Sequence, residues 1–135
     1  MKNKYGNKKT VVDGITFDSL AEAKYYEQLK WLLVNKQIKS FRLQPTFLLQ
    51  DGFKKNGKTY RKIEYVADFE VHHLDGSIEI VDVKGFETTD FKIKKKLFNY
   101  KYPHKLSLVT YSITDGGWIE LEQLTKNRKN RRKAK

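Results

Sequence analysis

Two aspartates and a lysine occur in a pair of strand-like segments that are otherwise largely apolar. Asp68 lies within residues 65–71, and Asp82 and Lys84 lie within residues 78–85. A short polar turn joins the two segments, so together they predict a β-hairpin. Carboxylates are ligands for Mg²⁺ or Mn²⁺, and a lysine beside them can orient an attacking water or offset charge on a phosphate. The pattern indicates a metal site that cuts a phosphodiester backbone.

The second strand gives the stronger evidence for a metal site. Asp82 and Lys84 continue a face that begins with Ile78 and Ile80, while Glu79 starts the opposite face and is a poor substitute for Asp82. Both faces are largely apolar, which is typical of a central strand covered on two sides. The i, i+2 spacing places the acid and the base side by side, roughly 7 Å apart along the strand. A structural ion pair is the alternative, but charges buried for stability alone are poorly compensated.

Asp68 is more ambiguous when its strand is considered alone. It alternates with Val66 and Glu70 on one face, and the apolar residues of the segment occupy the other face. That alternation is typical of a solvent-facing acid on a half-exposed strand. The spacing by itself therefore favours a structural role for Asp68.

Glu22 also has two explanations. Ser19 and Glu22 match the capping box, in which a serine and a glutamate satisfy free amides at a helix start. On a helical wheel for residues 19–35, however, Glu22 falls near the middle of the apolar arc. That arc comprises Tyr25, Leu29, Leu32 and Leu33, with Tyr26 at its margin. A carboxylate facing the core is costly unless a cation meets it, so the structural and catalytic roles both stay open.

The remaining pattern predicts an α/β (α+β) fold with a mixed central sheet of about four to five strands flanked by helices. The elements follow the order α-β-β-β-α-β. Helices are expected over residues 19–35 and 89–100, and strands over 41–50, 60–73, 77–84 and 106–112. A short extended piece covers 10–17, a loop covers 51–57, and 118–124 fits a strand or a short helix. We divide the chain into a flexible basic N-terminus (1–9), a single domain (10–125) and a basic C-terminal tail (126–135).

Composition narrows the class of protein. With 135 residues, of which 39% are hydrophobic, the chain can build one genuine core. It has no apolar run near 18 residues and no hydrophobic signal segment, so we expect neither a membrane span nor secretion. Cysteine is absent, which excludes disulfides and thiolate zinc sites. These features fit a cytoplasmic protein.

The net charge of +12 favours a polyanionic partner, and nucleic acid is the usual one. Residues 126–135 contain seven basic side chains and no acid, and lysines also cluster over residues 92–105. A solubility tail or a membrane-surface contact is the alternative, but no amphipathic membrane helix accompanies the charge. Aromatic residues amount to 13%, yet we find no RNA-recognition signature, so an RNA-binding protein is a lesser alternative.

With these residues identified, the chain resembles the PD-(D/E)XK nuclease superfamily. That pattern has an acid on the first helix, an Asp on one strand, and (Asp/Glu)-x-Lys on the next. The chain is more closely similar to a family of small phage-borne proteins assigned to the superfamily. The likeness covers roughly residues 3–112. It is carried by Asn3-Lys4-Tyr5-Gly6, Phe17-Asp18-Ser19 with Glu22, Gln44-Pro45, Ala67-Asp68-Phe69 and Asp82-Val83-Lys84-Gly85.

The resemblance implies a restriction-endonuclease-like core and an Mg²⁺-dependent DNA endonuclease in which Mn²⁺ can substitute. Superfamily members of similar size include phage-type Holliday-junction resolvases, which act as homodimers on branched DNA. By this likeness Asp68, Asp82 and the Val83 carbonyl bind the metal, Glu22 completes the site, and Lys84 assists the attacking water. Ala67 stands where proline is common, and Asp82 stands where Glu is common. Both departures are tolerated in the superfamily.

Seven further residues are candidates for contacting DNA, and they share a basic or amide side chain: Gln44, Lys92, Lys94, Lys95, Arg128, Arg131 and Arg132. Such contacts position a duplex without reading its sequence, so we expect selectivity for DNA structure. The rival hypothesis is a non-catalytic DNA-binding module in which Asp82 and Lys84 form a structural pair.

Overall fold

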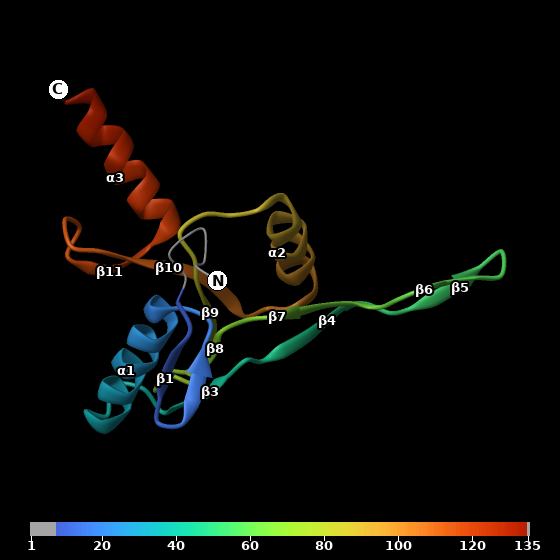
Figure 1. Cartoon of the computed structure of the whole chain (residues 1–135), viewed down its shortest axis with the longest axis horizontal. Helices are drawn as coiled ribbons and strands as arrows, with labels where there is room; N and C mark the ends of the chain where they lie inside the picture. The colour runs from blue at the N-terminus through green and yellow to red at the C-terminus, as the bar shows by residue number, and fades with distance from the viewer. Residues whose placement is uncertain (1–7, 135) are drawn as a thin grey trace.

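The computed structural model describes residues 8–134 and contains a five-stranded mixed sheet with three helices (Figure 1). The strand order is β11-β10-β9-β8-β3, and only the neighbours β9 and β10 are parallel. The strands are β3 (Ser40–Leu43), β8 (Phe69–His72), β9 (Ile78–Val83), β10 (Lys105–Ser112) and β11 (Gly117–Glu120). The expected α/β class with a mixed central sheet is confirmed.

Two helices cover opposite faces of this sheet, as Figure 1 shows. Helix α1 (Leu20–Val34) packs on the face that presents Val81, and α2 (Thr89–Lys101) packs on the face that presents Ile80. Both β9 residues are fully buried. The prediction that this strand is central and covered on two sides is therefore confirmed.

Helices α1 and α2 each begin at a side-chain cap. Ser19 accepts a hydrogen bond from the backbone N–H of Glu22, as the capping box requires, and Thr88 caps α2 in the same way. The buried stripe of α1 differs from the expected arc, because Tyr26 is buried and Leu33 is exposed. Tyr26 packs against the rings of Phe17, which precedes α1, and Phe41 of β3, and these contacts rotate the stripe.

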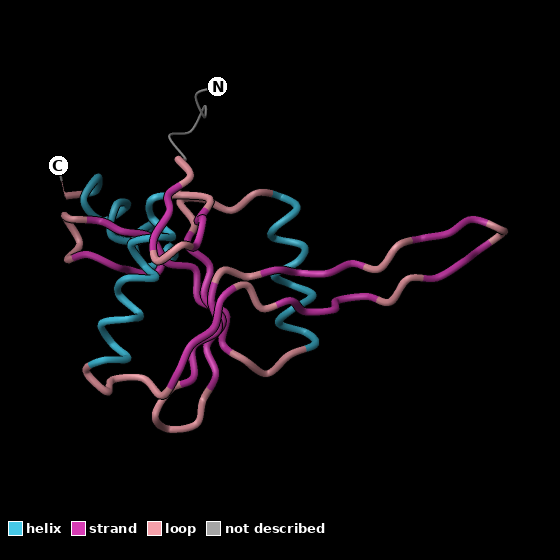
Figure 2. Tube along the Cα trace, turned by 60° about the horizontal axis from the view of Figure 1, so that its bottom comes forward, coloured by secondary structure: helices cyan, strands magenta, loops and turns pink. Residues whose placement is uncertain are grey.

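Three two-stranded ribbons complete the fold. They are β1 (Thr10–Val12) with β2 (Ile15–Phe17), β4 (Thr46–Gln50) with β7 (Ile63–Val66), and β5 (Phe53–Lys55) with β6 (Lys58–Tyr60). The last two continue one another as a long hairpin that projects from the body of the protein (Figure 2). The prediction of a loop over 51–57 is wrong, since this segment forms the outer part of that hairpin.

Both long strands expected from the sequence are interrupted. The segment 41–50 breaks at Gln44-Pro45, where Gln44 has a φ of 50°, and 60–73 breaks at Ala67-Asp68. Proline cannot donate to a strand ladder and fixes its own φ, which explains the first break. The second lies opposite it, because Gln44 N–H donates to the Asp68 carbonyl and Ala67 N–H donates to the Pro45 carbonyl.

The break at Asp68 also divides an apolar run between two cores. Tyr65 and Ala67 pack with α2, whereas Phe69 and Val71 pack with α1. The sequence alone assigns all four side chains to one face of a single strand. That assignment is wrong because the chain leaves one layer and enters the other at Asp68.

The C-terminal part is a strand followed by a helix. Residues 118–124 belong to β11 and to the start of α3 (Leu121–Lys133). The basic segment 126–135, expected as a tail, is helical to Lys133, so the boundary at residue 125 falls inside α3. Most of the expected flexible N-terminus (1–9) lies outside the described residues. Within residues 8–134, no helix has both the length and the apolar character that a membrane span requires.

Candidate active site

Asp68 and Asp82 lie side by side although 13 residues separate them in the chain. Asp68 occupies the break before β8, and Asp82 is the fifth residue of β9. The backbone N–H of Asp68 donates to Asp82 Oδ1 at 2.9 Å. The backbone N–H of Val83 donates to Asp68 Oδ2 at 2.8 Å. These two bonds hold the carboxylates in fixed orientations, and Asp82 is only 2% exposed.

Lys84 completes a charged pair with Asp82. Its Nζ lies 4.0 Å from Asp82 Oδ2 and 4.4 Å from the centre of the Phe91 ring at the start of α2. Its backbone N–H donates to the Val109 carbonyl, which anchors the end of β9 to β10. The ammonium group is thus oriented by an acid and an aromatic face, and it remains partly open to solvent.

Glu22 joins the same group from the first turn of α1. Burial raises the pKa of Glu22, and the negative charges of Asp18 and Asp82 raise it further, while Lys84 lowers it. Glu22, Asp68 and Gln44 line one small cavity of about 80 Å³ beneath the β1–β2 ribbon. The structure therefore brings together Glu22, Asp68, Asp82 and Lys84, and it places Gln44 beside them.

A divalent cation fits the chemistry of this donor set. Burial raises the pKa of Asp68 to about 8, and the neighbouring Asp82 carboxylate adds to the effect. Clustered carboxylates that resist ionisation gain most from a cation, and oxygen ligands suit Mg²⁺ and Mn²⁺. Among the described residues, no three His, Cys, Asp or Glu side chains form a ready-made metal cluster. Val83, expected to contribute its carbonyl, contacts the site in this structure through its N–H.

Tyr65 is a site residue that the sequence did not reveal. Its hydroxyl donates a hydrogen bond to Asp82 Oδ2, and its side chain is buried between β4 and α2. Burial and the charge of Asp82 raise the pKa of Tyr65, so its hydroxyl stays protonated and remains a donor. No spacing rule could identify this contact, because it depends on the change of layer at Asp68.

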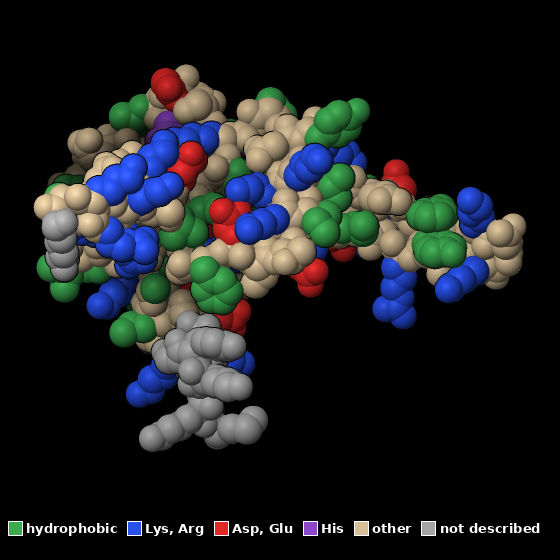
Figure 3. All heavy atoms as spheres, turned by 90° about the horizontal axis from the view of Figure 1, so that it is seen from above, with side chains coloured by type: hydrophobic (Ala, Val, Ile, Leu, Met, Phe, Trp, Pro, Cys, Tyr) green, Lys and Arg blue, Asp and Glu red, His purple; other side chains and the backbone are tan. Residues whose placement is uncertain are grey.

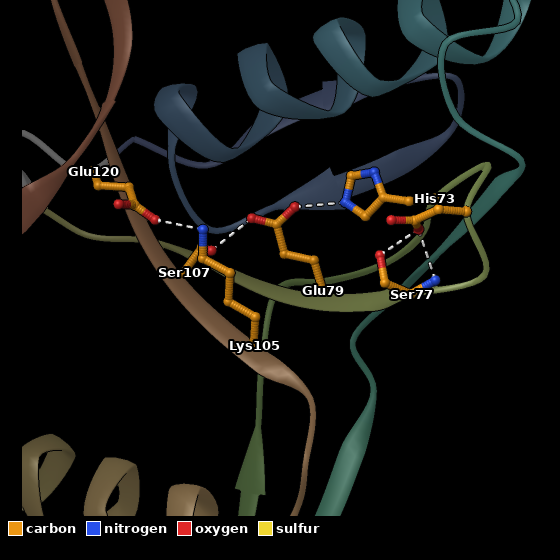
Figure 4. A network of polar contacts seen from close by, with 7 residues as sticks. His73, Ser77, Glu79, Lys105, Ser107 and Glu120 are labelled. Atoms are coloured by element: carbon orange, nitrogen blue, oxygen red, sulfur yellow. Dashed lines mark hydrogen bonds and ion pairs between the residues drawn. The ribbon is translucent and has the colours of Figure 1, made fainter.

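Glu79 is held away from the carboxylate group, on the opposite face of β9. Ser107 Oγ donates to Glu79 Oε2 at 2.5 Å, and the His73 ring lies 2.8 Å from Oε1 (Figure 4). Figure 4 also shows Lys105 directed toward Glu120, in a separate ion pair of 3.1 Å. The structure thus gives Glu79 its own partners and separates it from Asp82.

A basic hollow begins immediately after Lys84. It has a volume of about 830 Å³ and lies between α2, β10 and α3. Its walls include four lysines, two predicted as DNA contacts and two not: Lys92, Lys95, Lys126 and Lys129. Lysine and arginine side chains gather over this part of the molecule in Figure 3. The hollow also contains three acids, Glu87, Glu120 and Glu122. Glu87 pairs with Lys95 at 2.6 Å, and Glu122 pairs with Lys126 at 3.7 Å.

The other predicted DNA contacts lie outside this lining. Lys94 is half-buried on α2, and Arg128 and Arg132 are exposed on α3. Arg131 forms a forked pair with Asp115, with nitrogen–oxygen distances of 2.8 and 3.3 Å. Arg131 therefore has a structural role in attaching α3 to the turn between β10 and β11.

Comparison with known proteins gives one family. No curated protein matches the chain. A family model matches residues 2–115, which include Glu22, Gln44, Asp68, Asp82 and Lys84. This match covers most of the chain, and the chain belongs to the family described as protein of unknown function DUF1064.

Proposed function

We propose that this protein is an Mg²⁺-dependent DNA endonuclease of the PD-(D/E)XK type that selects branched or otherwise structured DNA. One observation carries the proposal: three carboxylates and a lysine from α1, the β7–β8 break and the end of β9 converge next to a basic hollow. Buried groups of like charge are costly, so such a cluster points to a function that uses it. We place the activity in the cytoplasm of a bacterial host, as a phage or prophage product.

The residues of the site have distinct roles in this proposal. Asp68 and Asp82 would hold the ion, and Glu22 would join them directly or through a water. When bound, the ion would lower the pKa of a water and polarise the scissile phosphate. Lys84 orients that water and offsets charge that develops on the phosphate. The Tyr65 hydroxyl fixes the orientation of the Asp82 carboxylate.

The basic hollow supplies the DNA contacts. Lys92 and Lys95 on α2, together with Lys126 and Lys129 on α3, face a space that starts at Gly85, next to the catalytic lysine. Contacts of this kind bind phosphates and carry no base information. Cutting both strands of a symmetric junction would require two sites, and hence a homodimer.

The test is a cleavage panel on four-way junctions, forks, nicked duplexes and plain duplexes with Mg²⁺, Mn²⁺ or EDTA. We expect products from branched DNA in either metal and none in EDTA. Asp82→Ala and Lys84→Ala should lose cleavage while retaining DNA binding. Lys36→Ala, which changes an exposed lysine beyond the far end of α1, serves as the matched control and should cleave normally.

A non-catalytic DNA-binding module is the second candidate. The observation that favours it is the contact of Lys84 with Asp82, which resembles a structural ion pair, together with the lack of a ready-made metal cluster in residues 8–134. Tight binding of every DNA in the panel with no cleavage in any metal would establish this candidate over the nuclease.

A further inference from the structure

The outer part of the projecting hairpin is exposed to solvent. Residues 51–62, here called the arm, are all exposed. Figure 1 shows the arm extending away from the sheet and from all three helices. An isolated two-stranded hairpin is at best marginally stable in water. The packing of the core therefore does not explain why this segment forms an ordered hairpin.

The arm is built to stay straight. Asn56 and Gly57 form its two-residue tip, with φ values of 51° and 74°, the conformation of a tight hairpin turn. Phe53 and Tyr60 lie opposite each other, and their rings stack at 4.8 Å with an angle of 8°. Near the base, a side chain at Gly52 would approach the Tyr60 carbonyl at 3.1 Å, so glycine lets the strands run close together.

The arm is strongly basic, and its single acid, Asp51, lies at its base. Its tip segment 53–62 contains five cations and no acid: Lys54, Lys55, Lys58, Arg61 and Lys62. Lys62 pairs with Glu64 at 3.5 Å, just beyond the arm. Within the described part of the chain, the other four have no ion-pair partner. A second copy of this arm would be repelled by these charges, whereas a polyanion would be attracted.

Two of these lysines destabilise the folded protein by repelling each other. Lys55 and Lys58 are directly opposed across the ribbon, beside the turn. Like charges in that arrangement destabilise a β-ribbon. An anion lying against both ammonium groups would remove the repulsion. The pair therefore indicates binding of a phosphate-rich ligand more than structural support.

Strands β4 and β7 connect the arm to the candidate active site. Strand β7 ends at Val66, two residues before Asp68, and β4 begins two residues after Gln44. The six residue-to-residue steps from Gln50 to Asn56 give a reach of roughly 20 Å at the usual rise per residue in a strand. The major groove of a duplex is about 12 Å wide and admits a two-stranded ribbon. A duplex that lies along the arm and along β4 and β7 would thus extend toward the carboxylate cluster.

We propose that the arm is a second DNA-binding element, which lies along or within a groove of the duplex and binds its phosphates through Lys54, Lys55, Lys58 and Arg61. This inference rests on the proposed function for the identity of the nucleic acid as DNA. The stacked Phe53 and Tyr60 keep the ribbon rigid, so little conformational entropy is lost on binding. The arm and the basic hollow then contact the duplex on two sides of the active site.

The test measures binding alone, so it does not depend on cleavage. A fluorescent duplex of about three helical turns is titrated in EDTA with wild type, Lys55→Gln/Lys58→Gln and Lys55→Arg/Lys58→Arg, over a range of salt concentrations. Lys36→Gln/Lys39→Gln removes two exposed charges beyond the far end of α1 and is the matched control. Thermal unfolding and circular dichroism of each variant establish that the fold is retained.

We expect the glutamine arm variant to bind about tenfold more weakly at moderate salt. Its slope of log affinity against log salt should be shallower by about 2, since each lost phosphate contact contributes about 0.9. The arginine variant should bind like wild type, and the control should change neither quantity. The thermal midpoint of the glutamine variant should not fall, because the opposed charges are gone.

An unchanged salt slope in the glutamine variant would overturn the proposal. So would a loss of self-association in sedimentation experiments with DNA binding intact, since that would make the arm a contact between copies. Absence of cleavage by wild type, with the arm effect present, would reject the nuclease and leave the arm as a DNA-binding element. The two failures are therefore distinguishable.

Discussion

The backbone N–H of Asp68 donates a 2.9 Å hydrogen bond to the carboxylate of Asp82, so two acidic side chains are fixed next to each other in a largely buried place. Ionising both of them there costs free energy. Backbone amides offset part of this cost, and so do the Tyr65 hydroxyl and the Lys84 ammonium. A bound cation would offset more of it. The predictions below follow from this arrangement and from the contacts that support it.

The stability of the metal-free protein should depend on pH through Asp68. Its pKa is raised from 3.8 to about 8, so between these pH values the folded protein binds a proton that the unfolded chain has lost. Stability from this group therefore falls as pH rises through the window. We expect the thermal midpoint in EDTA to fall by several degrees more in wild type than in Asp68→Asn over this range.

Added Mn²⁺ should then restore stability most at the alkaline end of the window, where Asp68 is ionised in the metal-bound protein. The measurement is thermal unfolding at several pH values with and without Mn²⁺. An equal pH slope in wild type and Asp68→Asn would show that Asp68 has an ordinary pKa and would contradict this prediction.

Tyr65→Phe should destabilise the protein through loss of a hydrogen bond to a buried carboxylate. Bonds to charged groups contribute about 1.5–3 kcal/mol, against about 0.5–1.5 kcal/mol for neutral partners. Tyr102→Phe is the matched control, since the Tyr102 hydroxyl donates to the neutral Leu48 carbonyl at 2.8 Å. Urea unfolding should show the larger loss for Tyr65→Phe, and equal losses in the two variants would contradict this prediction.

Lys84→Ala should separate catalysis from binding. The lysine contacts Asp82 and the Phe91 ring and lies at the edge of the basic hollow without forming its walls. We expect the cleavage rate to fall by about 10²–10³, as for loss of one group that stabilises transition-state charge. DNA affinity should change less than twofold. Lys94→Ala on α2 is the comparison, and a rate loss of similar size there would remove the special role of Lys84.

The attachment of α3 should depend on Asp115. Hydrogen bonds from Arg131, Ser112 and Asn127 lower the pKa of Asp115, so this carboxylate supports α3 at neutral pH and loses that support only in strong acid. Asp115→Ala should increase amide hydrogen exchange in α3 beyond Asn127 while leaving exchange in β9 unchanged. Arg132→Ala, which alters an exposed arginine on the same helix, should leave both unchanged.

Local sequence signals predicted much of the fold. The Ser19 cap, the alternation in β9 and the length of α2 depend on neighbouring residues, and the structure has each of them. The strand break at Ala67-Asp68 was not predicted, because it interrupts an alternation of apolar residues that is continuous in the sequence. This break can be recognised only in the tertiary structure, where the partner strand is interrupted directly opposite, at Gln44-Pro45.

The residues of the candidate site also differ in whether the sequence alone could identify them. Residue types and spacing alone identified Asp82 and Lys84, since both lie on one short strand and their proximity follows from its geometry. Glu22, Asp68 and Tyr65 acquired their places only in the tertiary structure, where the chain changes layers at Asp68 and α1 packs over the sheet. Sequence patterns report which face of an element a residue occupies, whereas contacts between distant elements depend on how those elements pack.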